Sequence, residues 1–146
     1  MLNQDYQKWH STYKLIIQWG DCDPADIVYY PNYYRWMDNA THHLFANKGY
    51  SFGEMREQFG SLGFPLIKAD ATFLAPSRVG DELTIYSRLE SGGRKSLKIE
   101  HHFCRENLLV VTGAEKRIMG AKRPKDGSLF AMLIPDEIVQ AFSVQD

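Results

Sequence analysis

Apolar residues recur with helical spacing in the segment that follows Pro31. They stand at i, i+3 and i+4 positions and form one stripe of a helix: Tyr33, Trp36, Met37, Ala40 and Leu44. Pro31 suits the first helical position, because its φ is preset and its missing N–H would have had no partner there. Gly49 is a natural residue for the end of this helix. The pattern predicts one helix from about residue 31 to about residue 49, with an apolar face that must be covered.

From Pro65 onwards the pattern changes to that of β-strands. Four segments rich in β-forming residues are separated by turn residues, namely 66–73, 82–90, 95–105 and 108–118. In the third segment Leu97, Ile99, His101 and Phe103 alternate with polar residues, which predicts a sheet with one packed face and one wetter face. We expect these strands to form an antiparallel meander.

Shorter elements complete the pattern. A first strand is expected at residues 13–18, after a loosely ordered polar arm of about ten residues. Ser51 and Glu54 suggest a capping box at the start of a short helix over 51–59, and residues 135–142 suggest a terminal helix. The packed face of the sheet needs an apolar partner, and only the long helix is strongly apolar. The simplest architecture is therefore α+β, with an antiparallel sheet wrapped around that helix. The whole chain, residues 1–146, is expected to form one domain.

Composition narrows the class of protein. A net charge of −1 over 146 residues lacks the electrostatic footprint of a nucleic-acid binder. Two cysteines make no disulfide framework. The first residues lack the pattern of a signal peptide, and no run approaches the ~18 apolar residues of a membrane span. We expect a cytoplasmic protein with neither a membrane nor a nucleic-acid partner.

The run GDCDPADIVYYPNYYRWMD, residues 20–38, resembles the signature of the 4-hydroxybenzoyl-CoA thioesterase family. The similarity continues through Gly63, Pro65, residues 68–85 and the turn GGRKSL at 92–97. This resemblance implies a hotdog fold and hydrolysis of an acyl-CoA thioester. It implies no cofactor, because coenzyme A enters as part of the substrate. It also implies a homodimer or a homotetramer of paired dimers, with sites at the dimer interface.

Asp23 is the first candidate for the chemistry. A carboxylate near a helix start can act as a general base on water or as a nucleophile on a thioester carbonyl. The alternative is an acidic turn residue that accepts hydrogen bonds from backbone donors. The family resemblance assigns the catalytic carboxylate to Asp23. Asp21 is expected to be structural, because two carboxylates this close disfavour each other's ionisation.

The start of the long helix is the second candidate. Backbone N–H groups in a first helical turn have no partner within the helix and carry the positive end of its dipole. A thioester oxygen placed there would be stabilised as it gains charge. The resemblance assigns this role to the N–H of Tyr30; otherwise it is an ordinary solvated helix start.

Further candidates concern the two ends of the substrate. Coenzyme A carries phosphate groups that basic residues recognise, and by resemblance Arg94, Lys95 and Ser96 contact its nucleotide end. An ordinary polar hairpin is the alternative. By resemblance Asp38 binds a polar substituent on an aromatic acyl group; otherwise it is an exposed helix carboxylate.

Two residues depart from the family pattern. Asp26 occupies a position where the family usually has glycine, which adds a charge near Asp23. Phe64 occupies an acyl-binding position where a small polar residue would help to bind a phenolic hydroxyl. These departures favour a larger or less polar acyl group than 4-hydroxybenzoyl.

Other chemistries are weaker candidates. Cys22 could act as a nucleophile, but its flanking aspartates disfavour the thiolate. No set of histidines with metal-ligand geometry is expected, since His101 and His102 point to opposite sheet faces. An aspartyl phosphotransferase would need a parallel sheet that the pattern lacks. The strongest rival is a hotdog module that binds acyl-CoA without turning it over.

Overall fold

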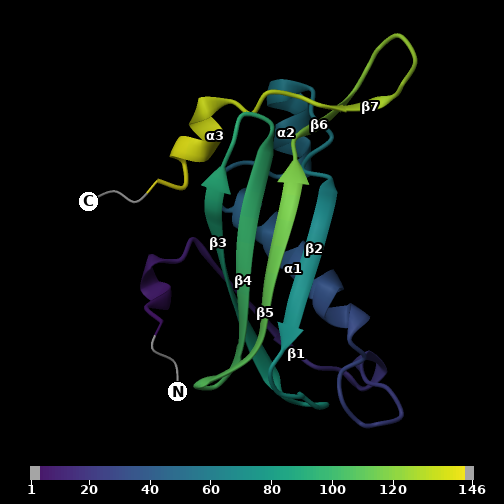
Figure 1. Ribbon diagram of the computed structural model, residues 1–146, viewed down its shortest axis with the longest axis vertical. Helices are drawn as coiled ribbons and strands as arrows, with labels where there is room; N and C mark the ends of the chain where they lie inside the picture. Colours follow the sequence, from purple (N-terminus) through teal and green to yellow (C-terminus); the bar gives the residue numbers. More distant parts are fainter. Residues whose placement is uncertain (1–3, 144–146) are drawn as a thin grey trace.

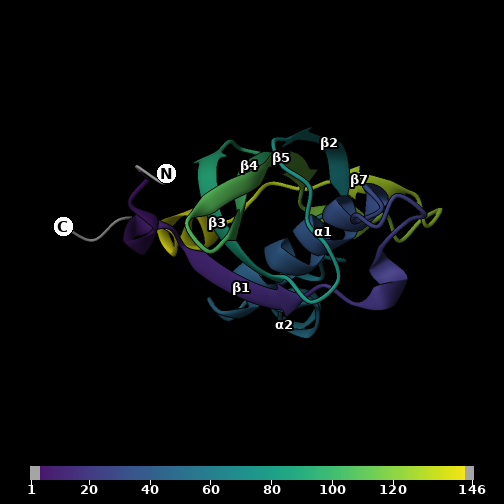
Figure 2. The same ribbon diagram turned by 90° about the horizontal axis from the view of Figure 1, so that it is seen from below.

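A computed structural model describes residues 4–143, and its centre is one long helix held against a five-stranded antiparallel sheet (Figure 1). The strands are β1 (Ser11–Ile16), β2 (Leu66–Phe73), β3 (Glu82–Gly92), β4 (Ser96–Arg105) and β5 (Leu108–Ile118), in the order β1-β3-β4-β5-β2. The helix is α1 (Pro31–Ala46), and Figure 2 shows the sheet arching over it. This is the hotdog fold that the sequence predicts.

Smaller elements lie around this core. They are the short 3-10 helices η1 (Tyr6–Lys8) and η2 (Trp19–Asp21), the helices α2 (Phe52–Phe59) and α3 (Asp136–Gln140), and the paired strands β6 (Gly120–Lys122) and β7 (Leu129–Ala131). Within residues 4–143, no helix has the length and apolar character needed to cross a membrane.

The predicted apolar stripe of α1 is buried along its whole length, from Tyr33 to Leu44. Pro31 is the first helical residue, and the chain turns away with Gly49 at a positive φ of 85°. The sheet meets this stripe closely at Gly113, where an added Cβ would lie 2.3 Å from the Met37 sulfur. Glycine at this position therefore lets the helix lie directly on β5.

The alternation predicted along β4 is confirmed. Leu97, Ile99, His101 and Phe103 are buried against the helix side, and the intervening residues are partly or fully exposed. The capping box of α2 is also confirmed, because the Ser51 hydroxyl and the Glu54 carboxylate each accept a backbone N–H of the other residue. The sheet thus has an inner face on α1 and an outer face turned away from it.

The predicted meander is correct only for β3, β4 and β5. The strand β2 does not lie beside β3; it pairs with β5 at one edge of the sheet, while β1 pairs with β3 at the other. Hydrophobic alternation gives the face of a strand but not its neighbour. The strand β1 also begins and ends two residues before the predicted 13–18. The hairpin of β6 and β7 was not predicted, because each strand has only three residues.

The prediction of a loosely ordered N-terminal arm is wrong for its described part, from residue 4 to residue 10. Tyr6 stacks on Tyr86 with ring centroids 4.0 Å apart, and its hydroxyl forms a 2.8 Å hydrogen bond with Nδ1 of His102. Trp9 is buried. The arm is anchored because its aromatic side chains cover part of the outer face of the sheet.

Candidate active site

The loop that leads into α1 is folded as a short hairpin, closed by an antiparallel bridge between Cys22 and Val28. Asp21 fixes this hairpin to its surroundings. Its carboxylate accepts the Gln18 N–H at 2.8 Å and an Arg35 N–H at 3.0 Å. Its backbone carbonyl accepts the Tyr29 N–H at 2.9 Å. The prediction that Asp21 is structural is confirmed by these contacts.

Asp23 lies at the tip of the hairpin. Its Oδ1 accepts the Ala25 N–H at 2.8 Å, so one carboxylate oxygen holds the turn. The other oxygen accepts no hydrogen bond from any residue between 4 and 143, and Asp23 lines a surface hollow of about 680 Å³ with Trp19 and Arg78. The structural and the chemical interpretations of this carboxylate are therefore compatible, because they use different oxygens.

Asp26 explains why a glycine would suit this turn. Its φ is +62°, in the left-handed region that a side chain disfavours, and aspartate is among the few other residues that tolerate it. Asp26 lines the same hollow as Asp23 and adds a second carboxylate there.

Tyr30 stands immediately before the first residue of α1. Its carbonyl accepts the Tyr33 N–H at 3.1 Å, while its own N–H has no hydrogen-bond acceptor in the part of the chain that the structure describes. Tyr30 is 59% exposed, and its ring lies edge-on to that of Phe73 of β2. The helix start thus offers an unused donor at the positive end of its dipole.

Cys22 is poorly suited to nucleophilic catalysis. Partial burial raises the pKa of its thiol, and the negative charges of Asp21 and Asp23 raise it further. A thiol of raised pKa is seldom ionised at neutral pH, and the thiolate is the reactive form.

Asp38 forms a hydrogen bond with the guanidinium of Arg117, a residue that was not predicted to belong to the site. Nη2 of Arg117 donates to Asp38 Oδ1 at 2.8 Å, and Nε2 of His42 lies 3.2 Å from the same oxygen. The Asp38 side chain is still 51% exposed, whereas Arg117 is buried. Asp38 is therefore more than an exposed helix carboxylate, because its hydrogen bond with the buried Arg117 fixes its position.

Arg117 belongs to a buried polar network between α1 and the inner face of the sheet. It also donates to Glu115, whose other oxygen lies 2.7 Å from His101 Nε2 and accepts the Thr41 hydroxyl. Ser87 completes the network with a 2.6 Å hydrogen bond to His101 Nδ1. Because each of these side chains is buried, they hold one another in place.

The charges of this network set the protonation of its carboxylate. Burial alone would raise the pKa of Glu115, but the hydrogen bond and charge of His101, together with Arg117, outweigh burial. The pKa of Glu115 is lowered to about 2. The buried glutamate is therefore ionised at neutral pH. The signal for this network was present in the sequence, because Glu115 and Arg117 fall on the inner-facing positions of β5.

Phe64 lies mainly in the core. Its ring is 4% exposed and stacks on Phe45 with centroids 4.1 Å apart, and it lines a small cavity of about 160 Å³ with His42 and Phe52. The Phe64 carbonyl accepts a 2.9 Å hydrogen bond from Nη1 of Arg117. The two predicted acyl-binding residues, Asp38 and Phe64, are thus brought together through one arginine.

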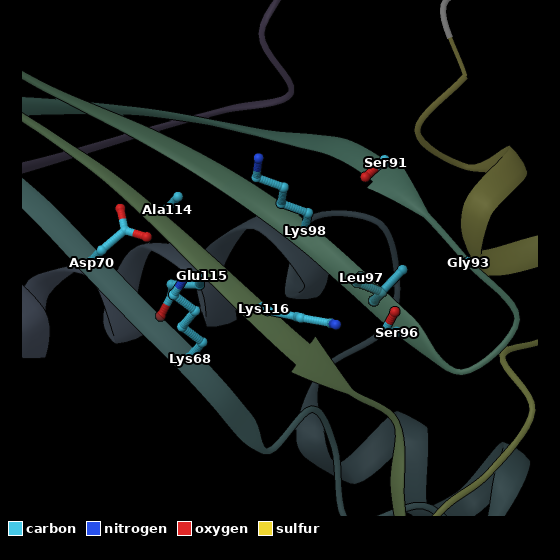
Figure 3. Close-up of a pocket in the computed structure, with 10 residues that line it drawn as sticks. All are labelled: Lys68, Asp70, Ser91, Gly93, Ser96, Leu97, Lys98, Ala114, Glu115 and Lys116. Atoms are coloured by element: carbon cyan, nitrogen blue, oxygen red, sulfur yellow. The ribbon is translucent and has the colours of Figure 1, made fainter.

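The turn between β3 and β4 carries the residues predicted to contact the nucleotide end of CoA. Arg94 and Lys95 are exposed, and Ser96 lines a hollow of about 430 Å³ on the outer face of the sheet (Figure 3). The turn is closed by a 2.7 Å hydrogen bond from the Gly93 N–H to the Ser96 carbonyl. Three lysines that the sequence analysis missed line the same hollow, namely Lys68, Lys98 and Lys116.

The predicted residues do not share one cavity within a single chain. Across residues 4–143, Asp23, Tyr30, Phe64 and Ser96 line four different hollows. The same part of the chain contains no group of three or more metal-ligating side chains.

The chain belongs to the thioesterase-like superfamily, whose sequence pattern matches residues 17–142. The class of enzyme that the sequence predicts, a thioester hydrolase, is thereby confirmed. Among known proteins, a 4-hydroxybenzoyl-CoA thioesterase from Pseudomonas sp. (strain CBS-3) is 36% identical in an alignment 134 residues long, which covers 87% of this chain and 93% of that protein.

Solved structures agree with this assignment. The structure of 4-hydroxybenzoyl-CoA thioesterase from the same Pseudomonas strain has a TM-score of 0.82 and 29% identity, covering 90% of this chain and 97% of that one. A variant of 4-hydroxybenzoyl-CoA thioesterase in complex with 4-hydroxybenzoyl-CoA has a TM-score of 0.83 and 29% identity, covering 91% and 98%. A gentisyl-coenzyme A thioesterase has a TM-score of 0.76 and 33% identity, covering 90% and 98%.

Proposed function

We propose that this thioesterase hydrolyses an aromatic acyl-CoA to the free acid and CoA, with Asp23 acting at the thioester and the Tyr30 N–H polarising its carbonyl. The observation that carries the proposal is that the loop leading into α1 presents a carboxylate oxygen of Asp23 and the helix-start N–H of Tyr30, and neither has a hydrogen-bond partner in residues 4–143. The relatives named for 4-hydroxybenzoyl-CoA and gentisyl-CoA support an aromatic substrate.

Two routes for Asp23 give the same products. The carboxylate either attacks the carbonyl carbon, forming an anhydride that water then cleaves, or takes a proton from water as that water attacks. In both routes the carbonyl oxygen gains negative charge, and one backbone donor at that position is typically worth roughly 2.7–4 kcal/mol. The CoA sulfur leaves as a thiolate and takes up a proton.

Different residues would bind the two ends of the substrate. Asp38 would bind a polar substituent of the acyl group, and Phe64 with its aromatic neighbours would contact the acyl ring. Arg94, Lys95 and Ser96 would bind the nucleotide end of CoA. The proposal needs no metal or cofactor besides the CoA of the substrate, and a cytoplasmic location stays a prediction.

A second copy of the chain would complete the site. Within residues 4–143, the edge strand β2 has no pairing partner on its outer side, and four apolar residues at its two ends are exposed, namely Leu66, Ile67, Phe73 and, just beyond its end, Leu74. Such an edge favours pairing with a copy of itself. A homodimer, or a homotetramer built from two dimers, would bring hollows that are separate in one chain to a shared interface.

The function is tested by thiol release from a panel of aroyl-, phenylacetyl- and aliphatic acyl-CoAs. We expect kcat/KM for the best aromatic substrate to exceed that for the aliphatic ones by at least about tenfold, because the candidate acyl pocket is lined by aromatic rings. A preference for aliphatic chains would contradict the aromatic assignment alone. Tight binding of every acyl-CoA without turnover would instead indicate a non-catalytic acyl-CoA-binding module.

The shared site is tested by mixing two inactive variants. If Asp23 and the CoA-binding turn of one site come from different subunits, Asp23→Asn subunits mixed with Arg94→Ala/Lys95→Ala subunits should regain activity. About a quarter of the wild-type activity is expected, because half of the dimers are mixed and each of these has one intact site. If verified mixed dimers are no more active than the average of the two variants, each site lies within one subunit.

A further inference from the structure

The outer face of the sheet carries three lysines in one row, here called the lysine row. Lys116 of β5 stands directly opposite Lys98 of β4 on one side and Lys68 of β2 on the other. Residues opposite one another in a sheet project from the same face. Neighbouring strands lie about 4.8 Å apart, so the row spans about 10 Å. Figure 3 shows the three side chains leaving three adjacent strands, with Lys116 extended towards Ser96.

This arrangement is unfavourable unless an anion offsets it. Like charges directly opposite in a sheet destabilise the pairing. Of the three lysines, only Lys98 forms an ion pair with a residue in the range 4–143. Its partner is Glu90 at 3.5 Å, and both side chains are largely exposed. Lys68 and Lys116 have none there. The other charged groups nearby are Asp70 and Glu115, which also line the hollow, and the pair formed by Arg88 and Glu100. The Glu115 carboxylate is engaged by His101 and Arg117.

The hollow beside the lysine row has the shape and chemistry of a phosphate site. Its volume is about 430 Å³, and besides the lysines it is lined by the small residues Ser91, Gly93 and Ser96, two of which carry hydroxyls. Gly93 and Ser96 belong to the turn that also carries Arg94 and Lys95. The lysine row and this turn therefore border the same hollow.

We propose that the lysine row binds the phosphate groups of coenzyme A, so that the phosphorylated end of the substrate lies across the outer face of β4, β5 and β2. This inference rests on the proposed acyl-CoA function and extends it from the β3–β4 turn to three strands of the sheet. The 3′-phosphate and the pyrophosphate of coenzyme A are separate anionic groups, and a row of ammonium groups can hold both at once.

The experiment measures binding of adenosine 3′,5′-bisphosphate by calorimetry. The wild type is compared with Lys68→Gln/Lys98→Gln/Lys116→Gln and with a control that removes three exposed lysines elsewhere, Lys8→Gln/Lys14→Gln/Lys48→Gln. We expect Kd to rise about tenfold or more in the first variant, which equals a loss of about 1.4 kcal/mol or more of binding free energy. In the control, Kd should stay within twofold of the wild-type value. The dependence of Kd on salt should also weaken in the first variant only.

An unchanged Kd in the first variant, or an equal rise in the control, would overturn the inference. Inorganic phosphate provides a second probe: if it binds as tightly as the nucleotide and is lost with the same lysines, the site is a general phosphate site and not one for coenzyme A. Should the triple variant fail to fold, Lys116→Gln alone is expected to raise Kd measurably, because it is the central lysine.

Hydrolysis separates this inference from the proposed function. An acyl-N-acetylcysteamine thioester lacks the nucleotide, so the first variant should hydrolyse it as fast as the wild type while kcat/KM for acyl-CoA falls about tenfold or more. If no thioester is hydrolysed but nucleotide binding still depends on the lysines, the proposed binding site is supported and the proposed hydrolysis is contradicted. If hydrolysis holds and the lysines have no effect on binding, only the inference falls.

Discussion

Replacing Asp23 with asparagine is expected to lower kcat about 10²–10⁴-fold, the usual contribution of a positioned base. Asparagine has the same shape and its Oδ1 can still accept the Ala25 N–H, so the turn should be preserved. What is lost is the negative charge on the oxygen that has no partner in residues 4–143. The Kd of the acyl-CoA should therefore change little, and single-turnover kinetics with a binding measurement can separate the two quantities.

Two variants at neighbouring residues serve as controls for the loss of activity in Asp23→Asn. Asp26→Gly removes a carboxylate from the same hollow at a position whose positive φ suits glycine, so it should fold and retain most of the activity. Cys22→Ser should also remain active, because the raised pKa of the thiol leaves little thiolate. An active Asp23→Asn enzyme together with an inactive Cys22→Ser enzyme would assign the chemistry to the thiol.

Replacing Glu115 with glutamine is expected to lower the free energy of unfolding at pH 7 by about 3–5 kcal/mol, as is typical when one partner of a buried ion pair is removed. The amide nearly keeps the volume of the carboxylate but removes the charge that faces His101 and Arg117. Urea unfolding measures the difference. Glu90→Gln is the matched control, because Glu90 pairs with Lys98 on the exposed surface and should cost little.

The same variant should change how stability depends on pH. The folded-state pKa of Glu115, about 2, lies below its ordinary value of 4.5, so its ionisation stabilises the fold fully above pH 4.5. That contribution is lost as the pH falls from about 4.5 to about 2. The stability difference between wild type and Glu115→Gln should therefore shrink over this range. A difference that is the same at pH 7 and pH 3 would mean that the Glu115 charge contributes nothing.

The long helix and the acidic turn before it could be predicted because their signals are local. Pro31, the apolar stripe from Tyr33 to Leu44, and the run of residues 20–38 each depend on neighbours in the sequence. The sequence predicts for Asp23 either a role as a turn acceptor or a chemical role, and its two oxygens allow both. These features need no knowledge of which strand lies beside which.

Most of the features that were missed depend on long-range pairing. The lysine row exists only because the register sets residues 68, 98 and 116 opposite one another. Arg117 meets Asp38 and Phe64 only because β5 lies against α1. The position of β2 beside β5 likewise required the folded sheet. Alternation in a sequence shows which side chains share a face, but sheet order and register decide which of them meet.

Because Arg117 bonds both residues that we propose to contact the acyl group, it would limit how the substrate range of this enzyme can change. Arg117 bonds the Asp38 side chain, the Phe64 backbone and the Glu115 carboxylate at the same time. Substitutions at residues that share such a partner are seldom additive. Pocket redesign, in the laboratory or in evolution, would therefore have to alter residues 38 and 117 together, and paired changes should succeed where stepwise changes lose the fold.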